Sequence, residues 1–195
     1  LLVLGCIDLS VGSVMAASGA VCCAIMKLGA PVWSAILAGI CTGLAFGAIN
    51  GFFSTKGGIN PFIVTIGTMN IGRGLTYVLI PGIGIGDLPK PFTVFGQTEF
   101  FHGMEYPVII SVIVVIIAWY YLKYTKAGRT FYFIGGSDIN ARLLGFNVNS
   151  IKFFTFLSTS LLAAIAGIIQ ASRFGSASNQ TGIGIELQVI LSAVL

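Results

Sequence analysis

Long apolar stretches alternate with short polar ones along the 195 residues of the chain. The apolar runs cover residues 1–26, 31–53, 61–80, 107–122 and 153–172, and another begins at 187. Within these runs only Asp8 and Arg73 carry a charge. A helix needs about 20 apolar residues to cross the hydrocarbon of a bilayer. The pattern therefore predicts an all-α fold, a polytopic transmembrane helical bundle forming a single domain over 1–195.

Both ends of the chain predict interrupted spans. Gly5 and Gly12 flank Asp8, and a polar, glycine-rich stretch leads to Glu186. Glycine weakens a helix, so we expect re-entrant or broken helices near Asp8 and after Glu186. The first residue is Leu and both ends lie in apolar sequence. We therefore expect the chain to be a fragment whose C-terminal spans are missing.

Composition agrees with a membrane protein. Charged residues make up 8% of the chain and hydrophobic residues 56%, and the mean hydropathy is +0.98. A soluble domain carries about 25% charged residues. The four cysteines lie in apolar runs without CxxC spacing, which is typical of small buried side chains and not of a metal site. His102 has no Cys or carboxylate at ligand spacing, so we expect no metal centre.

One polar loop, 123–152, holds the charge that orients the chain. It carries five Lys or Arg residues against Asp138, a net charge of +4 that equals the charge of the whole chain. Basic loops between membrane spans face the cytoplasm. The loop 81–106 has a net charge of −2 and is expected on the extracytoplasmic side. The predicted location is a bacterial inner (plasma) membrane, crossed several times.

Glycines recur every fourth residue in the second apolar run. They are Gly39, Gly43, Gly47 and Gly51, which makes three overlapping GxxxG steps on one helix face. Such small residues let two helix backbones approach closely, so the stripe predicts a tightly packed helix interface. Asn50 lies beside it and is placed to form a hydrogen bond across that interface.

Four polar residues at membrane depth are candidates for a translocation path. They are Asp8, Ser10, Asn70 and Arg73. Ionisable residues inside a span often serve transport, but Asp8 could equally cap a helix at the membrane surface. Arg73 could extend its side chain outward to the interface, or pair inside the bundle with a carboxylate such as that of Asp8. The residues alone leave both pairs of alternatives open.

The basic loop contains the pattern of a short helix. Gly135 and Gly136 break the chain, Ser137 or Asp138 can cap a helix over 139–144, and Gly145 can end it. Ile139 and Leu143 would then lie on one face. A helix this short is unstable alone in water, so it either lies on the membrane or docks into a groove of a partner. A surface turn that only fixes topology is the simpler alternative.

Four separated motifs carry a resemblance to a known family. GRTFYFIGGSDINARLLGFNV resembles "GR…YxIGGNxxAARLSGI" of ABC importer permeases of the ribose/xylose type. GCIDLSVGSVMA is similar to that family's "GGIDLSVGS", and INPFIVTIGTMNIGRGL to its "PPFIVTLGTMxIxRGL". ASRFGSASNQTGIGIELQVI is similar to "xSRxGSAxPxxGxGYELDAI". The motifs occur in the family's order and cover nearly the whole chain.

The resemblance implies a monosaccharide permease subunit whose loop couples it to an ATPase. The implied coupling residues are Gly135, Gly136, Ser137, Asp138, Ala141, Arg142, Leu143 and Gly145. It further implies a cytoplasmic ABC ATPase, a second permease subunit in a homo- or heterodimer, and a periplasmic or lipid-anchored solute-binding protein. Cofactors would be absent from this chain, with ATP and Mg on the partner ATPase. Asp8 to Ser10, Arg73 and Glu186 match further positions of the family's motifs.

The chain also departs from the family's pattern. Ser137 replaces the usual Asn, Leu144 replaces Ser, Gln188 replaces Asp and Cys6 replaces Gly. These differences bear on the identity of the solute and on the details of the partner contacts.

Two other classes of membrane protein compete with this interpretation. A secondary transporter driven by an ion gradient needs an ionisable carrier in a span, for which Asp8 is the candidate. An intramembrane enzyme needs catalytic pairs or an HExxH motif, and the sequence has none. No GxxxxGK[ST] motif occurs, so the chain is not expected to be an enzyme or to bind ATP through a P-loop.

Overall fold

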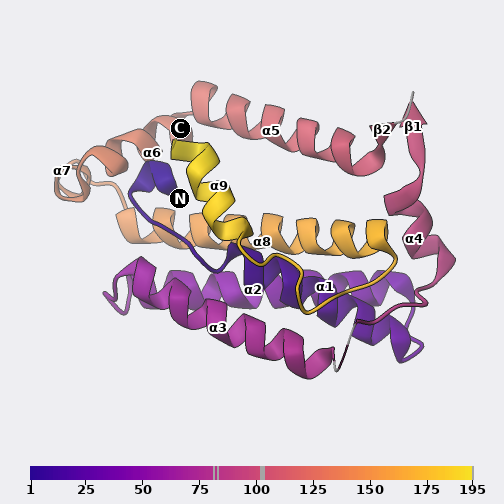
Figure 1. The fold of residues 1–195 in the computed structure, drawn as a ribbon. Coiled ribbons are helices and arrows are strands. Elements are labelled where there is room, and N and C mark those ends of the chain that lie inside the picture. Colours follow the sequence, from indigo (N-terminus) through magenta and orange to yellow (C-terminus); the bar gives the residue numbers. More distant parts are fainter. Residues whose placement is uncertain (81, 83, 102–103, 195) are drawn as a thin grey trace.

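The fold, given by a computed structural model, is a bundle of helices lying lengthwise beside one another (Figure 1). The structure describes residues 1–80, 82, 84–101 and 104–194. The elements of the first half are η1 (Leu2–Leu4), α1 (Val11–Lys27), α2 (Val32–Thr55), α3 (Pro61–Leu79), α4 (Lys90–Gln97), β1 (Glu99–Phe101) and β2 (Met104–Glu105). Those of the second half are α5 (Tyr106–Tyr124), α6 (Lys126–Gly136), α7 (Asp138–Leu143), α8 (Val148–Phe174) and α9 (Ile185–Val194).

Four helices among the described residues, α2, α3, α5 and α8, are long and apolar enough to cross a membrane. The prediction of an all-α polytopic bundle is confirmed, and the chain is a multi-pass membrane protein. The antiparallel pair β1–β2 is a short hairpin that joins α4 to α5 and leaves the fold class unchanged.

Local sequence sets where the long helices begin and end. The Asn60 side chain accepts a hydrogen bond from the Phe62 amide, and Pro61 occupies the first turn of α3. Asn147 caps α8 in the same way, through the Ser150 amide. These contacts satisfy backbone N–H groups that have no partner within the helix. At its other end α8 stops at Gly175, whose φ of 63° suits glycine.

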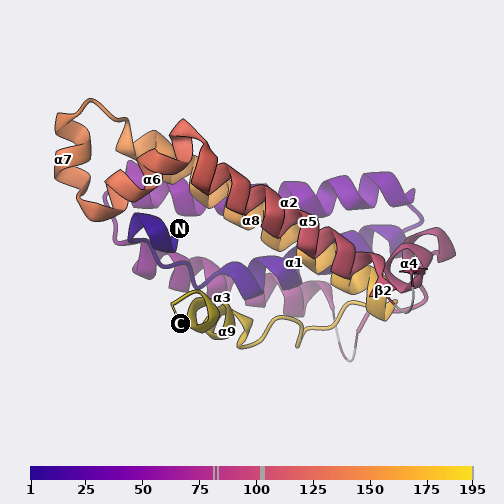
Figure 2. The ribbon, with the colours of Figure 1, turned by 90° about the horizontal axis from the view of Figure 1, so that it is seen from above.

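The bundle has two distinct ends, which we call the α4 end and the α7 end (Figure 2). At the α4 end, the ammonium of Lys27, the last residue of α1, lies 3.6 Å from the Asp87 carboxylate, and Arg173 at the end of α8 pairs with Glu105 at 2.6 Å. At the α7 end, Lys152 at the start of α8 pairs with Asp138. The acidic loop 81–106 and the basic loop 123–152 therefore lie at opposite ends.

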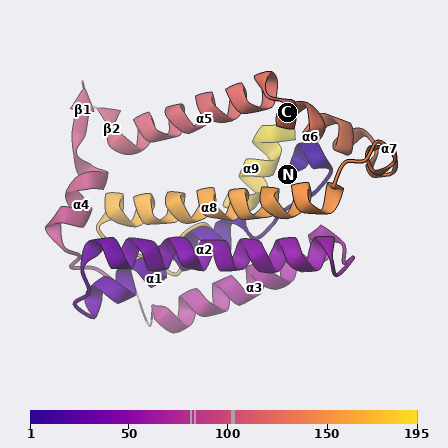
Figure 3. The same ribbon diagram turned by 180° about the vertical axis from the view of Figure 1, so that it is seen from behind.

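Helix α8 lies at the centre of the packing, against α1 and α2 (Figure 3). The α1 contact is a backbone approach, because a Cβ on Gly167 would overlap the Met15 carbonyl and one on Gly19 would lie 2.9 Å from the Gly167 carbonyl. Ala163, Gly167 and Ala171, small residues that recur every fourth position along α8, are buried.

Helix α5 stands apart from the other long helices and contacts mainly α4 and α6 (Figures 1 and 3). None of its residues is buried, as expected for a span facing lipid. Between α5 and α8, near the α4 end, lies an apolar cavity of about 420 Å³ with side chains from α2, α4, α5 and α8, among them Ile36, Phe92, Phe95, Ile110 and Ile168.

Two segments interrupt the bundle. Residues 5–10 are non-helical between η1 and α1, and residues 175–184 form turns between α8 and α9. The interruption expected after Glu186 lies before it instead, because α9 is continuous over Ile185–Val194. Helices α4 and α6 were not predicted. Both are short, and neither has an apolar run long enough to stand out from its loop.

Candidate functional site

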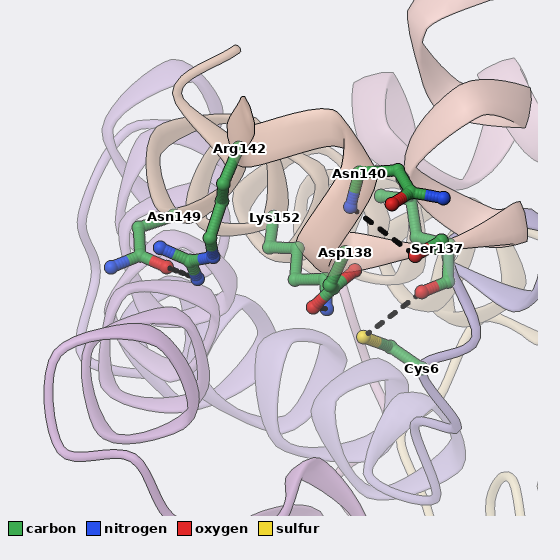
Figure 4. Close-up of polar contacts among 8 residues, drawn as sticks. Cys6, Ser137, Asp138, Asn140, Arg142, Asn149 and Lys152 are labelled. Atoms are coloured by element: carbon green, nitrogen blue, oxygen red, sulfur yellow. Dashed lines mark hydrogen bonds and ion pairs between the residues drawn. The ribbon is translucent and has the colours of Figure 1, made fainter. Parts of the chain in front are cut away.

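A short helix does lie within the basic loop. Ser137 ends α6 and begins α7, and its hydroxyl accepts a hydrogen bond from the Asn140 amide at 3.3 Å (Figure 4). After α7, Gly145 has a φ of 83°, a backbone conformation that favours glycine. The sequence left Ser137 and Asp138 as alternative caps, and the structure selects Ser137.

Two polar contacts tie α7 to the start of α8 (Figure 4). Asp138 accepts a hydrogen bond from the Lys152 ammonium in an ion pair, and Arg142 donates one to the Asn149 side chain at 2.7 Å. Arg142 is therefore engaged within the chain. Displacement of α7 would act on α8 through both contacts.

The apolar side chains of α7 face outward. Ile139 is 72% exposed and Leu143 81% exposed, and Leu144 beyond the helix is also exposed, whereas Ala141 is buried. Exposed apolar residues on a segment outside the membrane spans mark a docking surface more often than exposed charges do. We call Ile139, Leu143 and Leu144 the α7 apolar face.

Beneath α7, the N-terminal segment joins the loop in a small core. Leu4 and Cys6 are buried with Ile134, Ala141 and Val148, so η1, α6, α7 and α8 share one apolar cluster. Figure 4 shows Cys6 below Asp138 and Lys152. The Cys6 thiol donates to the Leu4 carbonyl at 3.7 Å. Burial raises the pKa of the Cys6 thiol, which therefore stays protonated at neutral pH.

The tightest contact of this core is at Gly135. A Cβ on Gly135 would overlap the Val3 carbonyl, whereas one on Gly136 would meet no atom within 4 Å. Of the two loop glycines, Gly135 thus allows α6 to touch the N-terminal segment. Along that segment, Asp8 lies five residues after Val3 and Ser10 seven residues after it.

Asp8 and Ser10 begin a chain of buried polar side chains. The Ser10 hydroxyl donates to Asp8 Oδ1 at 2.6 Å, and the Ser10 amide donates to the same oxygen at 2.8 Å. Asn50 on α2 donates to the Ser10 hydroxyl at 2.9 Å and accepts from the Thr68 hydroxyl on α3 at 2.7 Å. The chain therefore links the N-terminal segment, α2 and α3 inside the bundle.

The structure corrects the view of Asp8 as a helix cap. Helix α1 begins at Val11, and Asp8 bonds Ser10 before the helix starts. Asp8 is only 7% exposed, and its Oδ2 has no hydrogen-bond partner among the described residues. A buried carboxylate oxygen without a partner is costly, which is typical of a group kept for function.

Arg73 holds the segment that follows α8. Its guanidinium donates to the Thr181 carbonyl at 2.5 Å and to the Gly182 carbonyl at 2.6 Å. Both alternatives from the sequence are therefore wrong: the side chain neither extends outward nor pairs with Asp8. Arg73 lies about 18 Å along α3 from Pro61. The segment 175–184 thus returns from the α4 end to the side of α3.

Gly12 lets that segment pass against α1. A Cβ on Gly12 would overlap the Gly182 carbonyl and the Glu186 carboxylate and would lie 3.4 Å from the Arg73 guanidinium. Glu186 Oε2 is buried without a hydrogen-bond partner among the described residues. Gly12, Arg73, Gly182 and Glu186 form what we call the Arg73 clamp, which joins α1, α3 and the start of α9.

Asn70 lies apart from both groups. It is exposed on α3, where its side chain donates only to the carbonyl of Ile66 one turn earlier. The structure therefore brings Asp8 and Ser10 together, places Arg73 in a separate clamp, and leaves Asn70 on the outer face of the bundle.

The glycine stripe of α2 lies against α8. A Cβ on Gly43 would overlap that of Ala164, one on Gly47 would lie 2.9 Å from Ser160 Cβ, and one on Gly51 would lie 2.8 Å from the Phe153 ring. Gly39 lies between the Ser18 carbonyl of α1 and Ile168 of α8. Among the described residues, the Asn50 side chain forms no hydrogen bond across this interface and instead bonds Ser10 and Thr68.

Comparison with known proteins decides the family. The model for "Branched-chain amino acid transport system / permease component" matches residues 1–195. The chain belongs to this permease family.

Several curated relatives of the permease are named for sugars. It is 38% identical over 193 residues to the ribose import permease protein RbsC of Haemophilus influenzae, which covers 97% of this chain and 59% of the relative. It is 39% identical over 191 residues to the L-arabinose transport system permease protein AraH of Escherichia coli K12, with 98% and 58% covered. The D-allose transport system permease protein AlsC of that strain is 35% identical over 190 residues, with 97% and 58% covered.

The permease thus spans under two thirds of the length of these relatives. No solved structure matches it. Among the described residues, no three His, Cys, Asp or Glu side chains gather where they could hold a metal ion, and His102 lies outside those residues.

Sequence reasoning about the permease missed several contacts of these sites. Thr68 was not predicted to form a contact and Gly12 was noted only as a flank of Asp8 that weakens a helix, although both join separate elements. Asn50 carried the clearest signal, since it is a polar residue beside the GxxxG stripe of an uncharged span. Nothing local indicated that Arg73 would bond backbone carbonyls 108 and 109 residues away.

Proposed function

We propose that this chain is the membrane-spanning subunit of an ATP-binding-cassette importer that moves a monosaccharide or sugar-like solute into the cytoplasm. A cytoplasmic partner subunit would bind ATP and Mg and hydrolyse the ATP. The observation that carries the proposal is the α7 apolar face, which is exposed on a helix tied to α8 by Asp138–Lys152 and Arg142–Asn149. A docking surface attached in this way can transmit a movement of the partner to α8 and the rest of the bundle.

The charge of the loops supports the proposed orientation. The basic loop at the α7 end would lie in the cytoplasm, and the acidic loop at the α4 end would lie outside a bacterial inner membrane. A periplasmic or lipid-anchored solute-binding protein would then dock at the α4 end. A second permease subunit, identical or different, would complete the pathway.

The proposed mechanism is alternating access. Closure of the ATPase pair would move α7, and the contact between Gly135 and Val3 would pass this movement to the segment that carries Asp8 and Ser10. The buried hydroxyl and amide groups of the chain Asp8–Ser10–Asn50–Thr68 offer weak polar contacts to a sugar. The Arg73 clamp would hold the segment 175–184 across the outer half of the route.

The solute class rests on the named relatives and not on the family description. The family model names branched-chain amino acids, while the relatives named for ribose, arabinose and allose cover nearly the whole chain. A sugar also needs no fixed charge to bind. A branched-chain amino acid needs groups for its ammonium and carboxylate, and Arg73 already bonds two carbonyls.

Reconstitution tests the proposal against its alternative. The full-length permease is placed in liposomes with and without its candidate ATPase, and uptake of ribose, arabinose, allose and leucine is measured with ATP or with an ion gradient. ATP-dependent uptake of a sugar is the expected result. Uptake driven by an ion gradient without ATP would instead support a secondary transporter, in which Asp8 would carry the ion.

A further inference from the structure

A second pocket lies at the junction of α5 and α6, away from the sites described above. It has a volume of about 360 Å³ and is lined by Trp119, Leu122, Lys123, Arg129 and Tyr132. It lies at the α7 end of α5, a helix without buried residues whose sides are open to lipid. The pocket combines aromatic, aliphatic and cationic walls within one small volume.

The two cations of this pocket are free to bind an anion. Among the residues that the structure describes, no carboxylate forms an ion pair with Lys123 or Arg129, whereas Lys27, Lys152 and Arg173 each have an acidic partner. An anion that binds between Lys123 and Arg129 therefore displaces no carboxylate of the described residues. Lys126, in the first turn of α6, adds a third positive charge close in sequence.

Aromatic rings hold the pocket in shape. The Lys123 ammonium lies 4.9 Å from the centre of the Trp119 ring and 5.6 Å from that of Tyr124. Trp119 and Tyr120 both pack on Tyr124, with ring centres 5.6 and 5.2 Å apart. Trp and Tyr side chains at the end of a span sit at the level of lipid headgroups. The rings thus hold the Lys123 ammonium, and a cation at that level faces the phosphates of a bilayer.

We infer that this pocket binds the phosphate headgroup of an anionic phospholipid, with Lys123 and Arg129 as its ligands and Trp119 and Leu122 against the glycerol and upper acyl chains. Basic pockets beside membrane helices on the cytoplasmic face bind such headgroups. The assignment to the cytoplasmic leaflet rests on the orientation proposed above, but the lipid chemistry does not. Loss of the lipid site and loss of sugar transport are measured separately.

Native mass spectrometry of the full-length permease with its ATPase tests the inference. The complex is titrated with phosphatidylglycerol or phosphatidylcholine, and the apparent affinity of the first bound lipid is measured. We expect phosphatidylglycerol to bind more tightly, and Lys123→Gln and Arg129→Gln each to weaken it about fivefold. Arg129→Lys keeps the charge and should retain most of the binding.

The matched control is Lys56→Gln. Lys56 also stands beside an aromatic ring, 5.9 Å from the centre of Phe52, but it lines neither of the two pockets described. Lys56→Gln should leave the affinity for phosphatidylglycerol unchanged, and an equal loss in this variant would show general surface attraction and overturn the site. Displacement of the lipid by millimolar inorganic phosphate would overturn it in favour of a free-anion site. A third outcome would also overturn the site: Lys123→Gln and Arg129→Gln bind the lipid as before, but the ATPase no longer stays bound to them. The pocket would then be a contact with the partner protein.

Discussion

The side-chain amide of Asn50 donates a hydrogen bond to the hydroxyl of Ser10 across 2.9 Å, joining residues 40 positions apart in a fully buried contact. Ser10 in turn donates to Asp8, and Asn50 accepts from Thr68. Asn50 is therefore the centre of a polar chain that joins the N-terminal segment, α2 and α3.

Replacing Asn50 should destabilise the bundle by breaking this chain. We expect Asn50→Ala to lower the unfolding free energy by about 1–3 kcal/mol, because the hydroxyls of Ser10 and Thr68 each lose a buried partner. SDS titration of the purified full-length permease measures the change. Asn70→Ala is the control, since Asn70 is exposed and bonds only within α3. An equal loss in both variants would contradict a special role for Asn50.

The glycine stripe should tolerate no added side chain where α2 meets α8. Gly43→Ala places a Cβ on that of Ala164 and close to the Ser160 carbonyl, so we expect a loss of about 1–3 kcal/mol in unfolding free energy. Gly67→Ala on α3 meets nothing within 4 Å, and alanine should add about 0.5 kcal/mol there because it is the better helix former. Unchanged stability of Gly43→Ala would argue that α2 and α8 are farther apart than described.

The Arg73 clamp should control access to the segment 175–184. Arg73→Ala removes two charged hydrogen bonds, each contributing about 1.5–3 kcal/mol, so the segment should open more often. Deuterium labelling of the backbone amides of residues 175–184 should then be faster in the permease. Thr181→Ala is the matched control because it leaves intact the backbone carbonyl that Arg73 bonds. Equal labelling rates in all three proteins would contradict the clamp.

Adjacent glycines give a sharp test of the contact between α6 and the N-terminal segment. Gly135→Ala should push Val3 away and expose Cys6, which is 2% exposed and whose raised thiol pKa keeps it protonated. Maleimide labelling of Cys6, in a Cys41→Ser background, should rise by about tenfold, which corresponds to about 1.4 kcal/mol of opening. Gly136→Ala, which meets no atom, should label as slowly as the unchanged protein.

The α7 apolar face should carry the coupling to the proposed ATPase. We expect Leu143→Asp to lower ATP-driven uptake by about tenfold or more, because a charge placed in an apolar groove loses about 1.4 kcal/mol or more of docking energy. Leu28→Asp alters an equally exposed leucine at the α4 end, 86% exposed, and should leave ATP coupling intact. Uptake as in the unchanged protein for Leu143→Asp would show that α7 is not the contact.

Much of the local structure follows from residue patterns. Uncharged runs fixed the spans α2, α5 and α8, and Asn60-Pro61 marked the start of α3. Ser137 and Gly145 bounded α7 correctly. Helix α6 escaped detection because its eleven residues hold charges, aromatics and three glycines, and it gains its apolar cluster only by contact with η1.

The partners of the site residues were less accessible to sequence reasoning. Arg73 was expected either to extend outward to the interface or to pair with a carboxylate such as that of Asp8. The folded chain instead presents it with two backbone carbonyls of a segment that has no helix to satisfy them. Unpaired backbone groups inside a membrane need partners as much as charges do.

The sequence by itself determined the apolar runs that form the long helices, the opposite charges of the two ends, and the face of α2 that packs. These depend on hydropathy, charge and spacing, which are properties of single segments. Only the tertiary structure decided that Asp8 meets Ser10 and Asn50, that Arg73 holds residues 181 and 182, and that Gly135 touches Val3. The physical reason is that polar groups in a bundle are satisfied by whichever donor or acceptor the packing of distant helices brings within reach.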